Sequence, residues 1–264
     1  MSVRFTILGC GSSGGVPRVG NVWGNCDPAN PKNRRRRCAL LVERFGKGGR
    51  TTVLVDTPPD LREQLLAASV EHVDAVLYTH AHADHTHGID DLRGMFFLTK
   101  RRIPVYADAE TRVSLESRFD YCFAQRPGSL YPSILDAKDI RAPDPIRIDG
   151  AGGIVEAVPI PQEHGEAPSL GFRFGGVAYS PDVGGIPEAS VALLGGLDLW
   201  IVDALRPASH PSHFGVQQTL EWIERLGVKR AILTHMTVEL DYERLRRQLP
   251  AHVEPAYDGM IVEA

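Results

Sequence analysis

Short runs of hydrophobic and β-branched residues recur along almost the whole chain, a pattern typical of buried β-strands. They predict strands at residues 3–9, 38–43, 52–56, 74–79, 103–107, 153–158, 170–174, 177–180, 198–203 and 229–234, with a last strand near 260–263. Longer amphipathic patterns predict helices at 59–68, 109–119, 213–226 and 241–248. The third is the clearest, since Gly227 follows an apolar stripe made of Val216, Leu220, Ile223 and Leu226.

The order of these elements favours mixed sheets with helices on their outer faces. Early strands come in consecutive pairs, whereas later ones are separated by helices, which fits a fully parallel doubly wound sheet less well. Residues 121–150, rich in Pro and Asp, are the least regular stretch and are expected to form an insertion near a site entrance. No repeat or long linker divides the 264 residues, so we expect a single domain over 1–264.

Composition and charge narrow the class of protein. Hydrophobic residues make up 43% of the chain and charged residues 23%, as in ordinary soluble proteins. The net charge of −4 argues against a surface that binds extended nucleic acid. No apolar run reaches the length of a membrane span, and residues 1–9 lack a signal-peptide core. Four cysteines do not make a disulfide framework, so we expect a cytoplasmic protein.

The segment Thr-His-Ala-His-Ala-Asp-His at 79–85 holds most of the candidate chemistry, and it directly follows an apolar strand-like run at 75–78. Imidazole and carboxylate groups are common ligands of zinc, manganese and iron. In an extended segment, alternate side chains share a side, which would group His80, His82 and Asp84. His85 breaks the alternation and with Asp84 can reach a second ion. The segment therefore predicts half of a two-metal site.

Further ligands are expected where later strands end, because open α/β-type sheets place functional groups at the carboxyl ends of their strands. The candidates are His164, Asp182 and His235. Each is weak alone: a single histidine after a strand is more often structural, and Asp182 in Pro-Asp-Val-Gly is most simply a turn residue. Together they complete a set of seven ligands.

This set, in this order, resembles the metallo-β-lactamase superfamily of binuclear hydrolases. The resemblance implies an α+β fold, an αββα sandwich of two mixed sheets, with the metals at one edge. One ion would be held by His80, His82 and His164, and the other by Asp84, His85 and His235. Asp182 would bridge the two ions, which are expected to be zinc or manganese, with iron as a third option.

Several single residues follow from the same resemblance. True β-lactamases of the superfamily carry a cysteine at the position of Asp182, so β-lactam hydrolysis is not expected. Asp56 matches an acid that orients a ligating histidine, although a cap for the helix at 59–68 is an alternative. His87 is expected to support a ligand rather than bind metal. Asp84 is expected to be catalytic as well as a ligand.

The opening segment, residues 8–17, resembles that of the PhnP-like phosphodiesterases and of the PqqB-type proteins. A Gly/Ser-rich loop can aim backbone N–H groups at an anion, which would make Ser12, Ser13, Gly14 and Gly15 substrate contacts. A turn without a ligand is the alternative. PhnP-like proteins often carry a structural zinc in a tight cysteine cluster just downstream of this segment. The stretch just downstream here has only Cys26 and Cys38, twelve positions apart and without a Cys-x-x-Cys pair, which puts that zinc in doubt.

His213 is the main candidate outside the metal shell. PhnP-like and tRNase Z-like phosphodiesterases are similar in placing a histidine here, where it meets the substrate phosphate or protonates the leaving oxygen. The expected helix start at 213 would favour an anion. His210 or a plain surface histidine are the alternatives. Arg34–Arg37 are either solvated and paired with acids or form an electropositive lip, and Arg93 is a weaker phosphate candidate.

These features together predict metal-assisted hydrolysis of a small phosphodiester, such as a cyclic ribose phosphate or a nucleotide-like diester. A thioester or lactone hydrolase would use the same metals. A tRNA-processing nuclease would need a long basic arm, which the sequence does not show. A non-catalytic PqqB-like binding protein would have degraded metal motifs, whereas all seven positions are filled here. Homodimer formation stays open.

Overall fold

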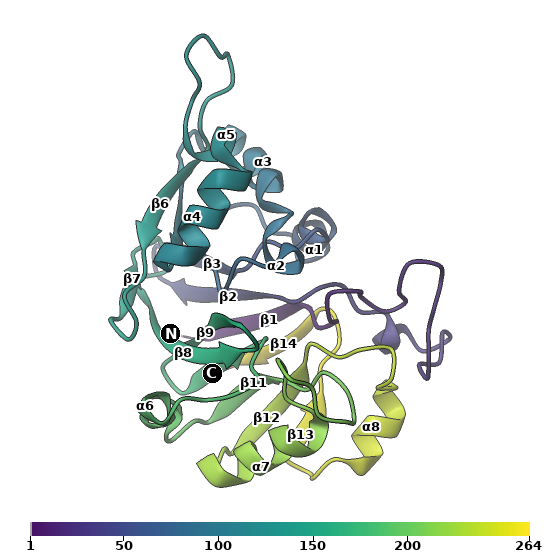
Figure 1. Ribbon diagram of the computed structural model, residues 1–264. Helices are drawn as coiled ribbons and strands as arrows, with labels where there is room; N and C mark the ends of the chain where they lie inside the picture. The colour runs from purple at the N-terminus through teal and green to yellow at the C-terminus, as the bar shows by residue number, and fades with distance from the viewer. Residues whose placement is uncertain (1) are drawn as a thin grey trace.

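The computed structural model describes residues 2–264 as two seven-stranded sheets packed face to face, with helices on the outside (Figure 1). In order across the first sheet lie β14 (Met260–Glu263), β1 (Val3–Gly9), β2 (Ala39–Gly46), β3 (Gly49–Val55), β4 (Ala75–Leu77), β5 (Ile103–Ala107) and β6 (Leu135–Asp139). Across the second lie β13 (Val253–Pro255), β12 (Arg230–Thr234), β11 (Leu199–Asp203), β10 (Val177–Ser180), β9 (Ala167–Phe174), β8 (Val155–His164) and β7 (Ile146–Ile148). The predicted sandwich is confirmed.

Helices cover the outer face of each sheet (Figure 1). On the first sheet these are α1 (Leu61–Ala67), α2 (Ala83–Thr86), α3 (Leu92–Thr99), α4 (Ala109–Arg118) and α5 (Asp120–Phe123). On the second they are α6 (Glu188–Val191), α7 (Val216–Leu226) and α8 (Tyr242–Gln248). Three short 3-10 turns lie at Pro31–Asn33, Ile89–Asp91 and Ala192–Leu194. No helix within residues 2–264 is long and apolar enough to cross a membrane.

Both sheets follow the same pairing pattern, antiparallel on one side and parallel on the other. In the first sheet β14, β1, β2 and β3 pair antiparallel, and β3, β4, β5 and β6 pair parallel. In the second, β7 to β10 pair antiparallel and β10 to β13 pair parallel. Parallel strands end at a common edge, so the loops after β3, β4, β10, β11 and β12 are brought close together.

Strand β3 shows how the sequence builds the layers. Val53 and Val55 are fully buried in the core between the sheets, where Phe172 of β9 also lies. The alternate residue, Leu54, packs on the other face in a cluster with Leu61 of α1. Burying such a side chain contributes roughly 1.5–3 kcal/mol, which explains the continuous apolar runs of strands covered on both faces.

Helix α7 begins at Val216, not at residue 213 as expected. Gly215, in extended conformation at φ −80° and ψ 164°, is its N-cap. The N–H of Phe214 donates to the carbonyl of Val183 at 2.7 Å, so the preceding residues are held by another loop rather than by the helix. Its end is as predicted, with Gly227 in left-handed conformation at φ 62°.

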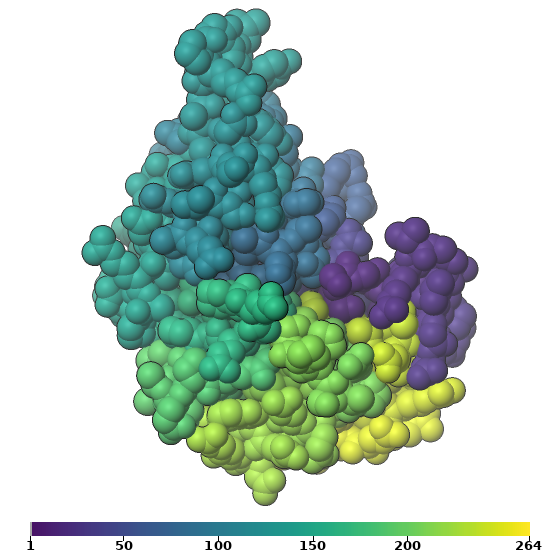
Figure 2. All heavy atoms as spheres, viewed as in Figure 1, coloured from purple at the N-terminus to yellow at the C-terminus, as the bar shows by residue number. Residues whose placement is uncertain are grey.

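The expectation of an irregular stretch at 121–150 is wrong in part. It contains β6, at one edge of the first sheet, and β7, at one edge of the second. Residues 124–134 form the loop that rises from the molecule between α5 and β6 (Figures 1 and 2). Helix α3 and strand β13 were also absent from the prediction.

Candidate metal centre

The metal-loop segment follows β4, but it is not extended throughout. His82 has extended backbone at φ −63° and ψ 151°, and it is the N-cap of α2, a single helical turn that contains Asp84 and His85. Thr86 Oγ1 donates to the carbonyl of His82 at 2.9 Å and fixes the start of this turn. The expected strand-like alternation through Asp84 is therefore wrong. The turn itself places Asp84 and His85 towards one centre.

A buried carboxylate orients His85. Asp56, which follows β3, has its Oδ2 atom 2.7 Å from Nδ1 of His85. Thr79 donates to the same carboxylate from its N–H and its hydroxyl, both at 2.8 Å. Asp60, not Asp56, is the N-cap of α1. Because Nδ1 of His85 is engaged, its Nε2 is the nitrogen left to bind a metal.

The second sheet supplies three more predicted ligands from the ends of its strands. His164 is the last residue of β8, Asp182 follows β10, and His235 follows β12. His164 is oriented by the carbonyl of Ser212, 2.7 Å from its Nδ1. His235 has a left-handed φ of 56°, a conformation that costs roughly 1–3 kcal/mol for a residue other than glycine and that clusters at functional sites.

The seven predicted ligands converge into two groups joined by Asp182. The ligand atoms of His80, His82 and His164 lie within 4.8 Å of one another, and so do those of Asp84, His85 and His235. Asp182 Oδ2 lies 3.9 Å from His80 Nε2 and 3.7 Å from His164 Nε2. On the other side, its carboxylate lies 3.0 Å from His85 Nε2 and 3.4 Å from His235 Nε2. The geometry is consistent with a binuclear site bridged by this carboxylate.

Buried atoms without hydrogen-bond partners show that these residues fit metal ions. They are the Nε2 atoms of His80, His85 and His235 and the Oδ1 atom of Asp182. Leaving a buried polar atom unpaired costs about 1–3 kcal/mol, so four such atoms facing one centre indicate a missing common partner. A pair of divalent cations satisfies all four, and neutral imidazoles with carboxylates suit zinc or manganese.

Protonation states in the cluster favour ligation. Burial lowers the pKa of His164 to about 4 and holds that of His80 well below its usual range. Burial opposes the ionisation of Asp84 and Asp182, but the neighbouring histidines keep the pKa of both carboxyls below the usual range. The centre therefore presents neutral imidazoles at His80 and His164 and ionised carboxylates at Asp84 and Asp182. His85 differs, because burial opposes its protonation but the carboxylates of Asp182, Asp56 and Asp84 raise its pKa well above the usual range.

His213 adjoins the cluster and is held by a carboxylate that the sequence analysis did not identify. Its Nδ1 lies 2.7 Å from Oδ2 of Asp203, a fully buried residue at the end of β11. The His213 ring lies 4.6 Å from that of His164 and stacks 4.7 Å from that of His235. The signal for Asp203 is its position: like Asp56, it is an aspartate that ends a buried apolar strand.

The alternative candidate, His210, lies beside His213, with their ring centroids 5.3 Å apart. Its Nδ1 is engaged by Ser212, whose N–H lies at 3.3 Å and whose hydroxyl lies at 3.1 Å. Within residues 2–264, none of the candidate metal-binding groups contains His210, whereas two contain His213.

The Gly/Ser-rich loop is less available to an anion than expected. Ser12 and Gly15 are buried. The N–H of Ser12 donates to the carbonyl of Met236, and the N–H of Gly15 donates to the carbonyl of Ser12. Ser13 and Gly14 are exposed, and in the described chain their N–H groups have no protein acceptor. Only these two residues could offer backbone donors to a substrate.

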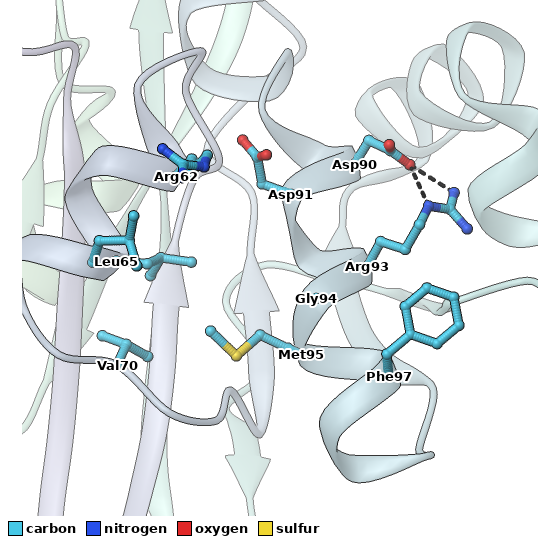
Figure 3. Close-up of a pocket in the computed structure, with 10 residues that line it drawn as sticks. Arg62, Leu65, Val70, Asp90, Asp91, Arg93, Gly94, Met95 and Phe97 are labelled. Carbon is cyan, nitrogen blue, oxygen red and sulfur yellow. Dashed lines mark hydrogen bonds and ion pairs between the residues drawn. The ribbon is translucent and has the colours of Figure 1, made fainter.

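Two other predicted residues lie outside the cluster. His87 is exposed, with its ring edge-on to Phe119 at 5.6 Å. Arg93 lines a cavity of about 440 Å³ between α1 and α3, where Asp90 holds its guanidinium at 2.6 Å (Figure 3). Its charge is thus already engaged.

The cysteines do not form a zinc cluster in the described residues. Cys26 Sγ donates to the carbonyls of Val238 and Leu240, both at 3.4 Å. Cys38 Sγ contacts other groups, the carbonyl of Gly11 at 3.6 Å and the hydroxyl of Thr234 at 3.5 Å. None of the candidate metal groups found in residues 2–264 includes a cysteine.

The fold and the site define a metal-dependent hydrolase class. The profile of the family described as "Beta-lactamase superfamily domain" matches residues 51–236, and the chain belongs to the metallo-β-lactamase superfamily. Within it, the chain is similar to a solved diphosphatase from the PhnP family, with 35% identity over all of this chain and 98% of that one and a TM-score of 0.87.

Other similarities are more distant or partial. Zinc-bound PqqB from Methylobacterium extorquens shares 18% identity over 98% of this chain and 99% of its own, with a TM-score of 0.73, which shows the fold alone. The curated octanoyltransferase of Porphyromonas gingivalis (strain ATCC BAA-308 / W83) is 33% identical over 263 residues, 98% of this chain. The chain spans about half of that relative, 51% of its length.

Proposed function

We propose that the protein hydrolyses a small phosphodiester, or a diester of diphosphate, with two divalent metal ions. The observation that carries this proposal is the pair of ligand groups joined by Asp182, with His213 and its buried partner Asp203 beside them. The similarity to a PhnP-family diphosphatase supports phosphorus, rather than carbon, as the centre that is attacked.

The metals would be held by His80, His82, His164, Asp84, His85, His235 and the shared Asp182, and would supply Lewis-acid polarisation of the phosphoryl group and acidification of water. Water attacks phosphorus, and the P–O bond to the leaving group breaks. Asp84, whose side chain is 16% exposed against 2% for Asp182, is the carboxylate best placed to take up a proton from the attacking water. His213 has its Nδ1 committed to Asp203, which leaves Nε2 to donate to the leaving oxygen.

The test is to measure the metal content of the purified protein and then turnover of several substrates. The panel comprises a dinucleotide phosphodiester, a cyclic ribose phosphate, a dinucleoside diphosphate, an acyl thioester and a lactone. We expect about two metal ions per chain and turnover of at least one phosphorus substrate. Turnover of the thioester or lactone alone would contradict the proposal.

A second candidate is hydrolysis of an acyl thioester by the same metals. The similarity to an octanoyltransferase favours it, because that name denotes the transfer of an acyl group. This relative is about twice as long as the matched segment, so its named activity need not reside in the part that matches.

The effect of replacing His213 distinguishes phosphodiester hydrolysis from thioester hydrolysis. A thiolate leaves without protonation far more readily than an alkoxide, since thiol pKa values lie near 8.5. Replacing His213 by alanine should therefore slow hydrolysis of an alkyl phosphodiester and leave an octanoyl thioester almost unaffected. If the protein turned over only the thioester, at a rate insensitive to His213→Ala, the second candidate would replace the first.

A further inference from the structure

A surface cavity of about 660 Å³ lies beside the Gly/Ser-rich loop and is lined by the run Arg34–Arg37. Its remaining walls include Gly15, the start of α1 at Asp60 and Glu63, and Asp258. In Figure 2 the purple N-terminal segment stands apart from the blue helical layer on this side of the molecule. The cavity brings the arginine run next to the loop that the sequence assigned to an anion.

The carboxylates in its wall are all paired. Asp258 binds Arg36 at 3.0 Å, and Asp60 binds Arg37 at 2.9 Å. Glu63 is paired with Arg62, which lies outside the lining. In the described chain neither Arg34 nor Arg35 has a carboxylate within ion-pair distance. The cavity therefore carries two positive charges that no acid of its wall offsets.

Arg35 is the less usual of these two residues, because its side chain is buried. It is 2% exposed, and its guanidinium donates only to uncharged groups: the carbonyl of Thr237 at 3.3 Å, Oδ1 of Asn33 at 3.4 Å and Sγ of Cys26 at 3.9 Å. Its Nε has no partner. A buried charge without a counterion is unfavourable, and an anion in the adjoining cavity would offset it.

Arg34 offers an exposed, pre-oriented donor at the same cavity. Its guanidinium lies over the ring of Trp23, 5.3 Å from the centroid, which restricts its motion. A planar guanidinium binds phosphate through two parallel N–H bonds. Arg18, the side chain next to exposed Gly14, adds a further charge near the loop.

The backbone of Gly11 lies between the arginine run and the segment that carries the ligand His235. Gly11 forms a bridge to Arg37 on one side and to Met236 on the other. Met236 directly follows the ligand His235. The loop 11–15 thus separates the arginine run from the metal ligands, with one backbone layer between them.

We propose that this cavity is an anion subsite that takes a phosphoryl group at a distance from the bond being cleaved. It deepens the proposed function, because the same substrate would carry a second phosphate. Substrates with two phosphoryl groups would then be preferred over simple diesters.

The test compares two exposed arginines that each stack on a tryptophan. Arg34→Gln removes one of the two unpaired charges of the cavity. Arg225→Gln is the matched control, since Arg225 lies 4.4 Å over Trp222 on α7. Inorganic diphosphate is titrated calorimetrically into the metal-loaded full chain. We expect Arg34→Gln to weaken binding about tenfold and Arg225→Gln to leave it unchanged. Equal affinity of Arg34→Gln and the wild type would overturn the proposal.

Kinetics then identify the source of the anion. A dinucleotide with a 5′-phosphate is compared with the same dinucleotide lacking it. Arg34→Gln should raise KM about tenfold for the first, leave its kcat unchanged and not affect the second. If diphosphate binding falls but KM does not respond, the link to the substrate is overturned. If neither dinucleotide is cleaved while binding still falls, the proposed function fails and the anion subsite stands.

Discussion

Replacing Asp203 by asparagine should reduce turnover without removing the metals. The carboxylate is fully buried, and its Oδ2 atom lies 2.7 Å from His213 Nδ1 and 3.1 Å from the N–H of Val183. Burial raises the pKa of the Asp203 carboxyl well above its usual range, although His235 opposes this rise. Asparagine keeps the shape but removes the acidic group that holds Nδ1 of His213. Because Asp203 binds no metal in the proposed scheme, the metal content should stay near that of the wild type.

The size of the effect follows from the contact that is lost. A hydrogen bond to a charged group contributes about 1.5–3 kcal/mol, which corresponds to a fall of about 10- to 160-fold in kcat. Loss of the carboxylate should also lower the pKa of His213, which burial already holds below its usual range. If His213 acts as an acid, the descending limb of the pH–rate profile should move to lower pH.

The assay measures kcat and metal content across pH for a phosphodiester with an alkyl leaving group. Asp198→Asn is the matched control, because Asp198 precedes the same strand at its other end and binds exposed Lys229. Full turnover in Asp203→Asn would refute the assigned role. Loss of metal in parallel with turnover would instead assign Asp203 to metal retention through His235, 3.8 Å away.

Three further outcomes test the centre. Asp182→Ala should abolish both metal binding and turnover, since its carboxylate contacts ligands of both groups, and full turnover would contradict the bridged site. His213→Ala should keep the metals and slow alkyl diesters more than a p-nitrophenyl diester, whose leaving group needs no proton; equal losses would argue against an acid role. Burial lowers the pKa of His164 to about 4 in the folded chain, against about 6.5 in the unfolded chain. In metal-free protein the contribution of neutral His164 to stability is therefore fully present above pH ~6.5. It is lost as the pH falls towards 4. The free energy of unfolding of the wild type relative to His164→Gln should therefore drop by up to about 3 kcal/mol over this range in urea titrations, and parallel curves would contradict it.

The fold was predictable from sequence where strands are covered on both sides. Strands β1, β5 and β10 match their expected ranges, because their apolar runs are bounded by polar or glycine residues. The edge strands β7 and β13 were not predicted because each has only three residues, too few to show an alternating pattern. Helix α3 was not predicted because its sequence contains Gly94 and only one of its side chains, Leu92, is buried, which leaves no clear apolar stripe.

The candidate ligands could be named from sequence, but their supporting groups could not. The carbonyl of Ser212 and the carboxylate of Asp203 belong to different segments, and only packing brings them to His164 and His213. The hydrophobic periodicity also predicted that the helix starts at residue 213. In the structure residue 213 lies in a loop, and the N–H of the next residue, Phe214, donates to the carbonyl of Val183. That anchoring places His213 against the cluster, so its position depends on the sheet rather than on a helix end.

Two buried aspartates, Asp56 and Asp203, hold histidines in the same way, but only Asp56 was identified from the sequence. Asp56 follows β3 of the first sheet and Asp203 is the last residue of β11 of the second. Each carboxylate holds the Nδ1 atom of a histidine at 2.7 Å. Asp56 was singled out by resemblance, whereas Asp203 has the same local pattern without that support. An aspartate that ends a fully apolar strand is poorly suited to burial unless it has a charged or hydrogen-bonded partner. In a chain with a metal motif, such a residue therefore indicates a histidine-orienting role that can be tested at both positions.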